Sequence, residues 1–245
     1  MKTAIVIPAR FASVRFPGKP LHVIKGKFLI ERVIEQALKC KVADVIVCAT
    51  DDKKIYNAVK KLGYNVFMTP VNLKSGTDRI AYVAKKHLKG CSVFINVQGD
   101  EPLADPMLMS ALIKELKKDK SLHYVTAAVE MEKSEDINNP NIVKVVLDKN
   151  NNALYFSRSA VPFIRGGGAN VPKPKFYKHM GIYGYKRDFL LKFASLKPTM
   201  LEQAECLEQL RALEAGNKVK VVISKKDSLG VDTPADARRV SRLIK

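Results

Sequence analysis

Short apolar runs alternate with stretches of helical periodicity along the first half of the chain. The apolar runs predict strands at 3–8, 44–50, 64–69 and 92–102. Apolar positions spaced three and four apart predict helices between them at 29–40, 52–63 and 75–88, the second ending on Gly63. This alternation is typical of βαβ units, and it predicts an α/β fold with a largely parallel sheet.

After Lys120 the order becomes mixed. Strands are predicted at 123–131 and 179–185, and 141–159 has the pattern of two strands joined by a polar turn at 148–152. Further elements are a loop marked by glycines at 166–168, a helix from Arg187, a helix at 203–216 capped by Gly216, a strand at 218–224 and a last helix from Thr233. We expect this half to be α+β, as a lobe inserted into the sheet.

Composition indicates a soluble globular protein. The chain has 245 residues, 47% of them hydrophobic, which is enough for one substantial core. The apolar run at 4–7 is too short for a signal peptide, and nowhere do about 18 uncharged apolar residues run together, so we expect a cytoplasmic protein without membrane partners. The four cysteines lack zinc-type spacing, and we expect buried free thiols: Cys40, Cys48, Cys91 and Cys206.

A net charge of +19 makes nucleic acid or an anionic metabolite the candidate partner. Many lysines occur as pairs on amphipathic patterns (53–54, 60–61, 85–86 and 117–118), which is typical of solvated helix faces. The chain has no tryptophan and no aromatic interleaving of the kind that binds single strands. We therefore expect no nucleic-acid partner, although charge alone leaves that alternative open.

The stretch IPARFASVRFPGKPL, at 7–21, places a basic loop directly after the first strand. Ligands of open α/β sheets bind at the carboxyl ends of strands. Its small residues would let backbone N–H groups approach phosphate oxygens, while Arg10, Arg15 and Lys19 supply charge. Neither GxGxxG nor a P-loop sequence follows the strand. The pattern favours a phosphate site of another kind over an ordinary basic surface loop.

Two aspartates lie in similar turns far apart in the sequence. Asp100 follows the fourth predicted strand in QGDEP, and Asp232 lies in GVDTP before a Thr-Pro helix start. Magnesium is commonly held by one or two carboxylates plus substrate phosphates. A Mg²⁺–triphosphate site is therefore a candidate, with turn formation or helix capping as the alternative for each aspartate.

Polar residues in the second half are open to two interpretations. Arg158, His179, Tyr183, Glu208 and Gln209 lie in three short stretches, SRSAVPF, YKHMGIYGY and LEQAECLEQLR. A single histidine on a strand is more often structural than catalytic. Acidic residues on a helix usually face solvent.

Blocks along essentially the whole chain resemble the 3-deoxy-manno-octulosonate cytidylyltransferase family, whose acidic sugar is abbreviated Kdo. In order they are IPARFASVRFPGKPL, ATDD, SGTDRIA, NVQGDEP, NPNIVKVV, ALYFSRSAVPF, KHMGIYGY, LEQAECLEQLRALEAG and GVDTPAD. The first block and QGDEP are similar to sugar-nucleotide cytidylyltransferases in general, and the blocks from Phe156 to Gly216 narrow the resemblance to the Kdo branch. Phe11 and Phe16 depart from the Tyr and Leu types expected there.

The resemblance implies a Rossmann-like nucleotidyltransferase fold, with a mostly parallel mixed sheet flanked by helices, in one domain over 1–245. A smaller α+β lobe at approximately 121–190 would serve sugar binding and homodimer formation. The implied reaction transfers CMP from CTP to Kdo, releasing pyrophosphate, for lipopolysaccharide assembly. A cytidylyltransferase for another acidic sugar such as sialic acid, a basic nucleic-acid-binding protein and an inactive homologue are the alternatives.

The resemblance also implies residue roles. Catalysis would depend on Arg10, Lys19, Asp100 and Asp232, with Asp100 and Asp232 as the Mg²⁺ ligands. The expected CTP contacts are Ala9, Arg10, Ser13, Lys19, Thr50, Ser75, Gly76 and Asp100. The expected Kdo contacts are Arg15, Gln98, Arg158, His179, Tyr183, Glu208 and Gln209.

Overall fold

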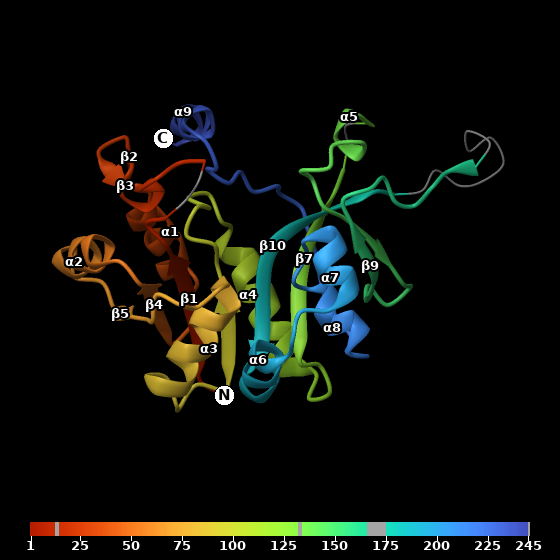
Figure 1. Ribbon diagram of the computed structural model, residues 1–245, viewed down its shortest axis with the longest axis horizontal. Coiled ribbons are helices and arrows are strands. Elements are labelled where there is room, and N and C mark those ends of the chain that lie inside the picture. The colour runs from red at the N-terminus through yellow and green to blue at the C-terminus, as the bar shows by residue number, and fades with distance from the viewer. Residues whose placement is uncertain (13–14, 132–133, 166–174, 245) are drawn as a thin grey trace.

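One mixed sheet runs through the molecule (Figure 1). The computed structural model describes residues 1–12, 15–131, 134–165 and 175–244. The central path of the sheet runs in the order β11 (Lys220–Ser224), β7 (Tyr124–Glu130), β10 (Tyr177–Lys186), β6 (Val93–Asn96), β1 (Thr3–Ala9), β4 (Val45–Thr50) and β5 (Val66–Met68). Along this path β10 is antiparallel to both of its neighbours, and the other pairs are parallel. The predicted α/β class and mostly parallel sheet are confirmed.

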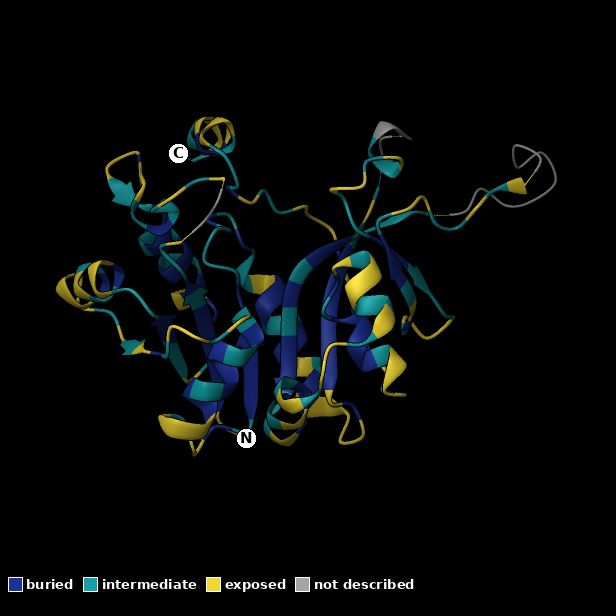
Figure 2. Cartoon of the chain, in the orientation of Figure 1, coloured by how far each residue is buried: buried dark blue, intermediate teal, exposed yellow. Residues whose placement is uncertain are grey.

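Helices cover both faces of the sheet (Figure 1). On one face lie α1 (Leu29–Leu38), α2 (Lys53–Lys61) and α4 (Pro106–Lys118), and on the other α3 (Gly76–Lys86), α6 (Arg187–Ser195) and α8 (Leu210–Glu214). Alternate residues of a strand point to opposite faces. In β1, Ile5 and Ile7 accordingly pack with α1, whereas Ala4 and Val6 pack with α3. The sheet is therefore buried on both sides, as Figure 2 shows.

Strand β10 joins the main sheet to a hairpin. Its residues 183–186 pair with β6, whereas Tyr177 and Lys178 pair with β8 (Lys144–Leu147), which in turn pairs with β9 (Ala153–Ser157). Both β7 and β10 lie inside the main sheet, so of the range 121–190 it is the β8–β9 hairpin that extends beyond the central path. The assignment of this range to sugar binding and dimer formation stays a prediction.

Smaller elements complete the described chain. They are the 3-10 helix η1 (Lys19–Leu21), the hairpin β2 (Val23–Ile24) and β3 (Lys27–Phe28), and the helices α5 (Ser134–Ile137), α7 (Met200–Glu205) and α9 (Pro234–Leu243). Thr233 caps α9 through its hydroxyl, which accepts a hydrogen bond from the backbone N–H of Asp236. The predicted last helix from Thr233 is confirmed.

The helix prediction at 203–216 was wrong. Cys206 has the left-handed conformation φ 52°, ψ 48°, which ends α7, and the chain turns through 207–209 before α8 begins. Left-handed φ and ψ are incompatible with a continuing right-handed helix. Gly216, with φ 72°, follows α8 as the expected terminator. Helix α4 was not among the predicted elements, although 117–118 were assigned to a helical pattern, Asp105 accepts a hydrogen bond from the N–H of Met107 at the helix start and a proline lies between them.

The surface features agree with most of the expectations from composition. All eight paired lysines are exposed, and six of them form the last turns of α2, α3 and α4, where positive charge complements the helix dipole. All four cysteines are free thiols, but Cys206 is exposed rather than buried. Among the described residues, no helix has the length and apolar character needed to cross a membrane.

Candidate active site

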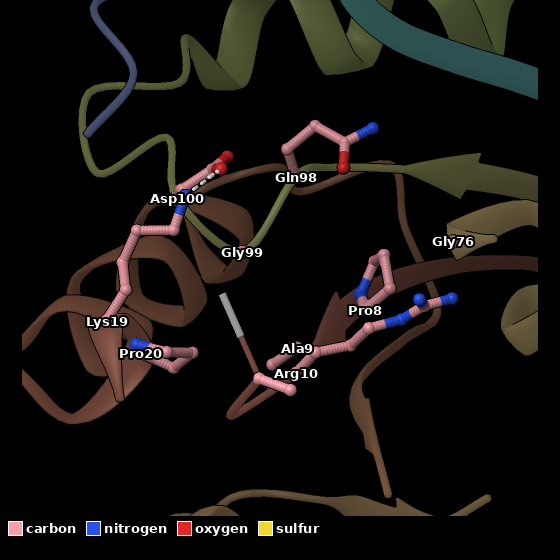
Figure 3. Close-up of a pocket in the computed structure, with 10 residues that line it drawn as sticks. Pro8, Ala9, Arg10, Lys19, Pro20, Gly76, Gln98, Gly99 and Asp100 are labelled. Atoms are coloured by element: carbon pink, nitrogen blue, oxygen red, sulfur yellow. Dashed lines mark hydrogen bonds and ion pairs between the residues drawn. The ribbon is translucent and has the colours of Figure 1, made fainter. Parts of the chain in front are cut away.

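The basic loop after β1 forms one wall of a pocket of about 240 Å³, which we call the loop pocket (Figure 3). The loop pocket is lined by Pro8, Ala9, Arg10, Ala12, Lys19, Pro20, Gly76, Gln98, Gly99 and Asp100. It therefore brings together segments from the ends of β1 and β6 and from the start of α3. Of the expected CTP contacts, Ala9, Arg10, Lys19, Gly76 and Asp100 line it. Ser13 lies outside the described residues.

Two glycines allow these segments to meet. A Cβ atom at Gly99 would lie 2.6 Å from the carbonyl oxygen of Pro8, which is closer than any side chain allows. A Cβ at Gly76 would lie 3.3 Å from Cγ of Pro8. The start of α3, whose unpaired N–H groups favour anions, therefore lies against the end of β1. The glycine before Asp100 does permit the close approach expected from the sequence.

Arg10 lines the loop pocket on the side opposite Lys19 (Figure 3). Its guanidinium donates a hydrogen bond of 2.9 Å to the carbonyl oxygen of Leu73, and in Figure 3 its side chain extends past Pro8 toward Gly76. Arg10 thus ties the segment before α3 to the basic loop. Positive charge lies on two sides of the pocket.

Lys19 joins the two predicted aspartates. Its Nζ lies 2.6 Å from Asp100 Oδ2 and 3.2 Å from Asp232 Oδ1, and Arg15 lies 3.1 Å from the same Asp232 oxygen. The N–H of Val231 donates a 2.8 Å hydrogen bond to the carbonyl oxygen of Asp100, which holds the two turns together. The aspartates are therefore neighbours, as their turns suggested, and Lys19 is buried to 12% exposure between them.

The same pair of carboxylates is compatible with magnesium. Asp100 and Asp232 are 32% and 48% exposed, so both present oxygen atoms to the site. Among the described residues no cluster of three or more His, Cys, Asp or Glu side chains could hold an ion. Magnesium is commonly held by one or two carboxylates, with water and substrate phosphates as the remaining ligands. The donor set therefore fits a magnesium ion that arrives with a phosphate substrate.

A second pocket, of about 440 Å³, lies on the other side of Asp232. We call it the bulge pocket, after a β-bulge in the pairing of β10 with β7. It is lined by Glu101, Asn141, Ile142, Val143, Lys178, His179, Met180, Gly181, Tyr183, Cys206, Leu207, Glu208, Gln209, Ser228, Gly230 and Asp232. Four of the expected Kdo contacts are among them. A fifth, Gln98, lines the loop pocket and donates a 3.2 Å hydrogen bond to the carbonyl oxygen of Gly181.

Three of the four expected Kdo contacts in the bulge pocket are neutral. Burial lowers the pKa of His179 to about 3, so its imidazole is uncharged near neutral pH. The hydroxyl of Tyr183 donates to Gln209 Oε1 over 3.4 Å, and the Gln209 amide nitrogen has no hydrogen-bond partner among the described residues. Glu208 accepts a hydrogen bond from the Thr77 hydroxyl, and its pKa is raised chiefly by burial. These groups suit a ligand that carries several hydroxyls.

Glu101 is a pocket residue that the sequence analysis missed. It lies in the bulge pocket, where Ser228 donates a 2.9 Å hydrogen bond to its carboxylate. Burial and the neighbouring charge of Asp100 raise its pKa to about 7. The signal was present, because Glu101 belongs to the same QGDEP turn as Asp100 and Gln98.

Four of the expected contacts that the structure describes line neither pocket. Thr50 is fully buried, and its hydroxyl accepts a hydrogen bond from the N–H of Asp52. Ser75 caps α3 and lines a neighbouring cavity of about 580 Å³. The guanidinium of Arg158 donates to the carbonyl oxygens of Pro140 and Glu205, at 3.0 and 2.7 Å. Their roles toward CTP and Kdo stay predictions, as does that of Arg15, which contacts Asp232.

The family that the chain matches defines its class of enzyme. A family model described as Cytidylyltransferase matches residues 4–221. A solved structure described as 4-diphosphocytidyl-2C-methyl-D-erythritol synthase from Anaerococcus prevotii shares the fold with a TM-score of 0.64 at 14% identity, covering 99% of this chain and 97% of that one. The class is therefore that of the cytidylyltransferases.

More similar proteins narrow the class. The 3-deoxy-manno-octulosonate cytidylyltransferase of Pelobacter propionicus is 45% identical, covering 96% of this chain and 94% of that protein. The enzyme of the same name from Fusobacterium nucleatum is 44% identical, covering 100% of this chain and 98% of that protein. A solved structure of CMP:2-keto-3-deoxy-manno-octonic acid synthetase complexed with CTP has a TM-score of 0.93 at 39% identity, covering 99% of this chain and 98% of that one. The chain belongs to the 3-deoxy-manno-octulosonate cytidylyltransferase family.

Proposed function

We propose that the chain transfers CMP from CTP to Kdo, releasing pyrophosphate, and so supplies an activated sugar for lipopolysaccharide assembly. The observation that carries the proposal is the meeting of the loop pocket and the bulge pocket at Lys19, Asp100 and Asp232. A nucleotide in one pocket and a sugar in the other would then be joined at this cluster. Family membership supports the same reaction.

The loop pocket is the proposed CTP site. The start of α3 and the small residues around Gly99 offer N–H groups at short range, and Arg10 and Lys19 offer charge from two sides. These groups would bind the triphosphate and stabilise the charge that develops when pyrophosphate leaves. The complex of the structural relative with CTP supports this assignment.

The bulge pocket is the proposed Kdo site. Its neutral polar groups would hydrogen-bond the sugar hydroxyls and hold the 2-hydroxyl in line with the α-phosphorus, so that positioning supplies much of the rate. Arg15, beside Asp232, is available for the sugar carboxylate.

Asp100 and Asp232 are the proposed Mg²⁺ ligands. When bound, the ion would neutralise phosphate charge and polarise the attacking hydroxyl. Both carboxylates lie at the junction of the pockets, which is where that chemistry is needed. Lys19, whose ammonium lies between them, would keep both side chains turned toward the junction.

A homodimer in the cytoplasm is the proposed state. Leu154 and Phe163 are 60% and 87% exposed, and both belong to the apolar segment 153–163. Burying such side chains against a second copy would remove them from water. Light scattering should then give twice the 27.3 kDa chain mass at micromolar concentration, and a monomer mass would contradict the dimer.

Free thiols at all four cysteines suit a reducing compartment.

Pyrophosphate release tests the reaction. The assay crosses the four ribonucleoside triphosphates with Kdo and sialic acid in the presence of Mg²⁺. We expect release with CTP and Kdo and little with any other pair. Equal rates with the two sugars would contradict the specificity for Kdo, and no release with either sugar would contradict the proposed reaction.

A further inference from the structure

A β-bulge shapes the floor of the bulge pocket. The pairing of β10 with β7 shifts register between His179, which lies opposite Ala128, and Tyr183, which lies opposite Thr126. Gly181, between them, has φ 66°, a left-handed conformation that glycine adopts without steric cost. Four steps along β10 correspond to two along β7 there, so the bulge shortens the separation of His179 and Tyr183, whose ring centroids lie 5.4 Å apart and which both line the pocket.

A fully buried threonine under the bulge contacts both sides of it. The hydroxyl of Thr126 donates a 2.7 Å hydrogen bond to the carbonyl oxygen of Ile182. The same hydroxyl oxygen lies 2.9 Å from Nε2 of His179. Thr126 is thus the link between the bulged backbone and the histidine.

The single proton of the Thr126 hydroxyl determines which atom is the donor in the hydrogen bond between Thr126 and His179. A threonine hydroxyl has one proton, and a carbonyl oxygen can only accept, so the Thr126 proton belongs to the bond with Ile182. The bond to His179 must then have Nε2–H as its donor. Burial of the ring, with Phe156 and Tyr183 at centroid distances of 5.0 and 5.4 Å, keeps it neutral, so Nδ1 carries a lone pair.

The second nitrogen is available to a ligand. Among the described residues nothing forms a hydrogen bond with Nδ1, and His179 lines the bulge pocket. The Gln209 amide nitrogen also has no partner among the described residues, but it is buried from solvent. The accessible unpaired group is therefore Nδ1 of His179, an acceptor to which a sugar hydroxyl can donate.

We propose that Thr126 is a positioning residue that fixes His179 in the neutral Nε2–H tautomer, which makes Nδ1 an acceptor for a hydroxyl of the sugar substrate. The role toward sugar rests on the proposed function, whereas the tautomer is a property of the free protein. Thr126 itself, beneath the histidine, acts only through it.

The tautomer is tested first, on the unliganded wild-type chain. The sequence has 4 histidines, so ¹⁵N-histidine labelling gives a simple spectrum, and His179→Gln identifies the His179 signals by their loss. Long-range ¹H–¹⁵N correlations distinguish the two tautomers and the charged ring. We expect Nε2–H for His179 at neutral pH. An Nδ1–H tautomer or an imidazolium would overturn the proposal whether or not the chain makes CMP-Kdo.

Kinetics tests the consequence with two variants of the same position. Thr126→Val keeps the shape and removes the hydroxyl, whereas Thr126→Ser keeps the hydroxyl. We expect Thr126→Val to raise KM for Kdo by about 10-fold, the loss of roughly one hydrogen bond, with KM for CTP unchanged. Thr126→Ser should retain wild-type KM values and the Nε2–H tautomer. Unchanged KM for Kdo in Thr126→Val, equal defects in both variants, or an equal rise in KM for CTP would overturn the role.

Discussion

The loop pocket and the bulge pocket recognise their ligands by different means. The loop pocket is built from segments that lie directly beside strand or helix ends, and its chemistry is the fixed charge of Arg10 and Lys19. The bulge pocket is built around an irregular strand and a broken helix, and three of the four predicted sugar contacts in it, His179, Tyr183 and Gln209, are neutral polar groups. Positively charged side chains attract a triphosphate whenever they lie close to it, without a fixed orientation of their protons. A polyhydroxy sugar needs donors and acceptors whose protons are placed by the surrounding structure.

The largest effect is expected where the two pockets meet. Asp100→Asn and Asp232→Asn keep the side-chain shape and remove the charge, so each should lower kcat by at least about 100-fold, roughly 2.7 kcal/mol. The double variant should be far from additive, because both residues serve one ion. Rates of pyrophosphate release measured across a Mg²⁺ titration check this.

Asp119→Asn is the matched control, because Asp119 lies on the surface, where its carboxylate accepts a hydrogen bond from Ser121. It should be nearly silent in kcat. Wild-type activity of Asp232→Asn at every Mg²⁺ concentration would show that Asp232 is only a turn residue.

A smaller and more selective effect is expected in the loop pocket. Gly99→Ala would place a methyl group against the carbonyl oxygen of Pro8, so the ends of β1 and β6 must separate. We expect KM for CTP to rise by about 10-fold or more and Tm to fall, since overpacking of this kind costs typically 1–3 kcal/mol.

Gly90→Ala is the control, because a Cβ there has no atom within 4 Å and its backbone φ lies outside the left-handed range. It should leave KM unchanged and Tm equal or slightly higher. If Gly99→Ala altered KM for Kdo and left KM for CTP alone, the assignment of the two pockets would be reversed.

A third effect, on stability and not on catalysis, is expected in the bulge pocket. His179 has a pKa of about 3 in the folded protein, below its ordinary value of 6.5. As pH falls below 6.5, the unfolded chain takes up a proton that the folded chain does not, so the free energy of unfolding decreases. His179→Gln removes this contribution. Between pH 7 and 5 the wild type should therefore lose about 2 kcal/mol more than the variant.

Urea unfolding at the two pH values measures this difference. His123→Gln, at an exposed histidine, is the control and should follow the wild type. Parallel pH dependence of the wild type and His179→Gln would mean that His179 titrates as freely when folded as when unfolded.

Much of the fold could be predicted from periodicity, because β1, α1, β4 and α3 each bury a regular apolar pattern. The place of β10 between β6 and β7 could not, since strand order depends on contacts that are distant in sequence. The end of helix α7 at Cys206 could not be predicted either. Its neighbours favour helix, and tertiary packing outweighs that local preference.

The candidate site also has residues that the sequence predicts and residues that it does not. The charged residues Lys19, Asp100 and Asp232 lie in turns that the sequence marks with glycine and proline, and the structure brings them together. Thr126 gave no such signal, because a threonine inside an apolar strand is common and its contact with His179 depends on the bulge in β10. Residues that act through fixed charge were therefore easier to find than residues that place protons.

The most direct test of the two-pocket account is a crystal structure with CTP, Mg²⁺ and a Kdo analogue that lacks the 2-hydroxyl and so cannot react. We predict the triphosphate against the basic loop and the start of α3, the sugar between β10 and 207–209, and the ion on Asp100 and Asp232. A sugar bound instead in the cavity lined by Lys74, Lys197 and Arg211, or an ion that leaves Asp232 without a role, would contradict it.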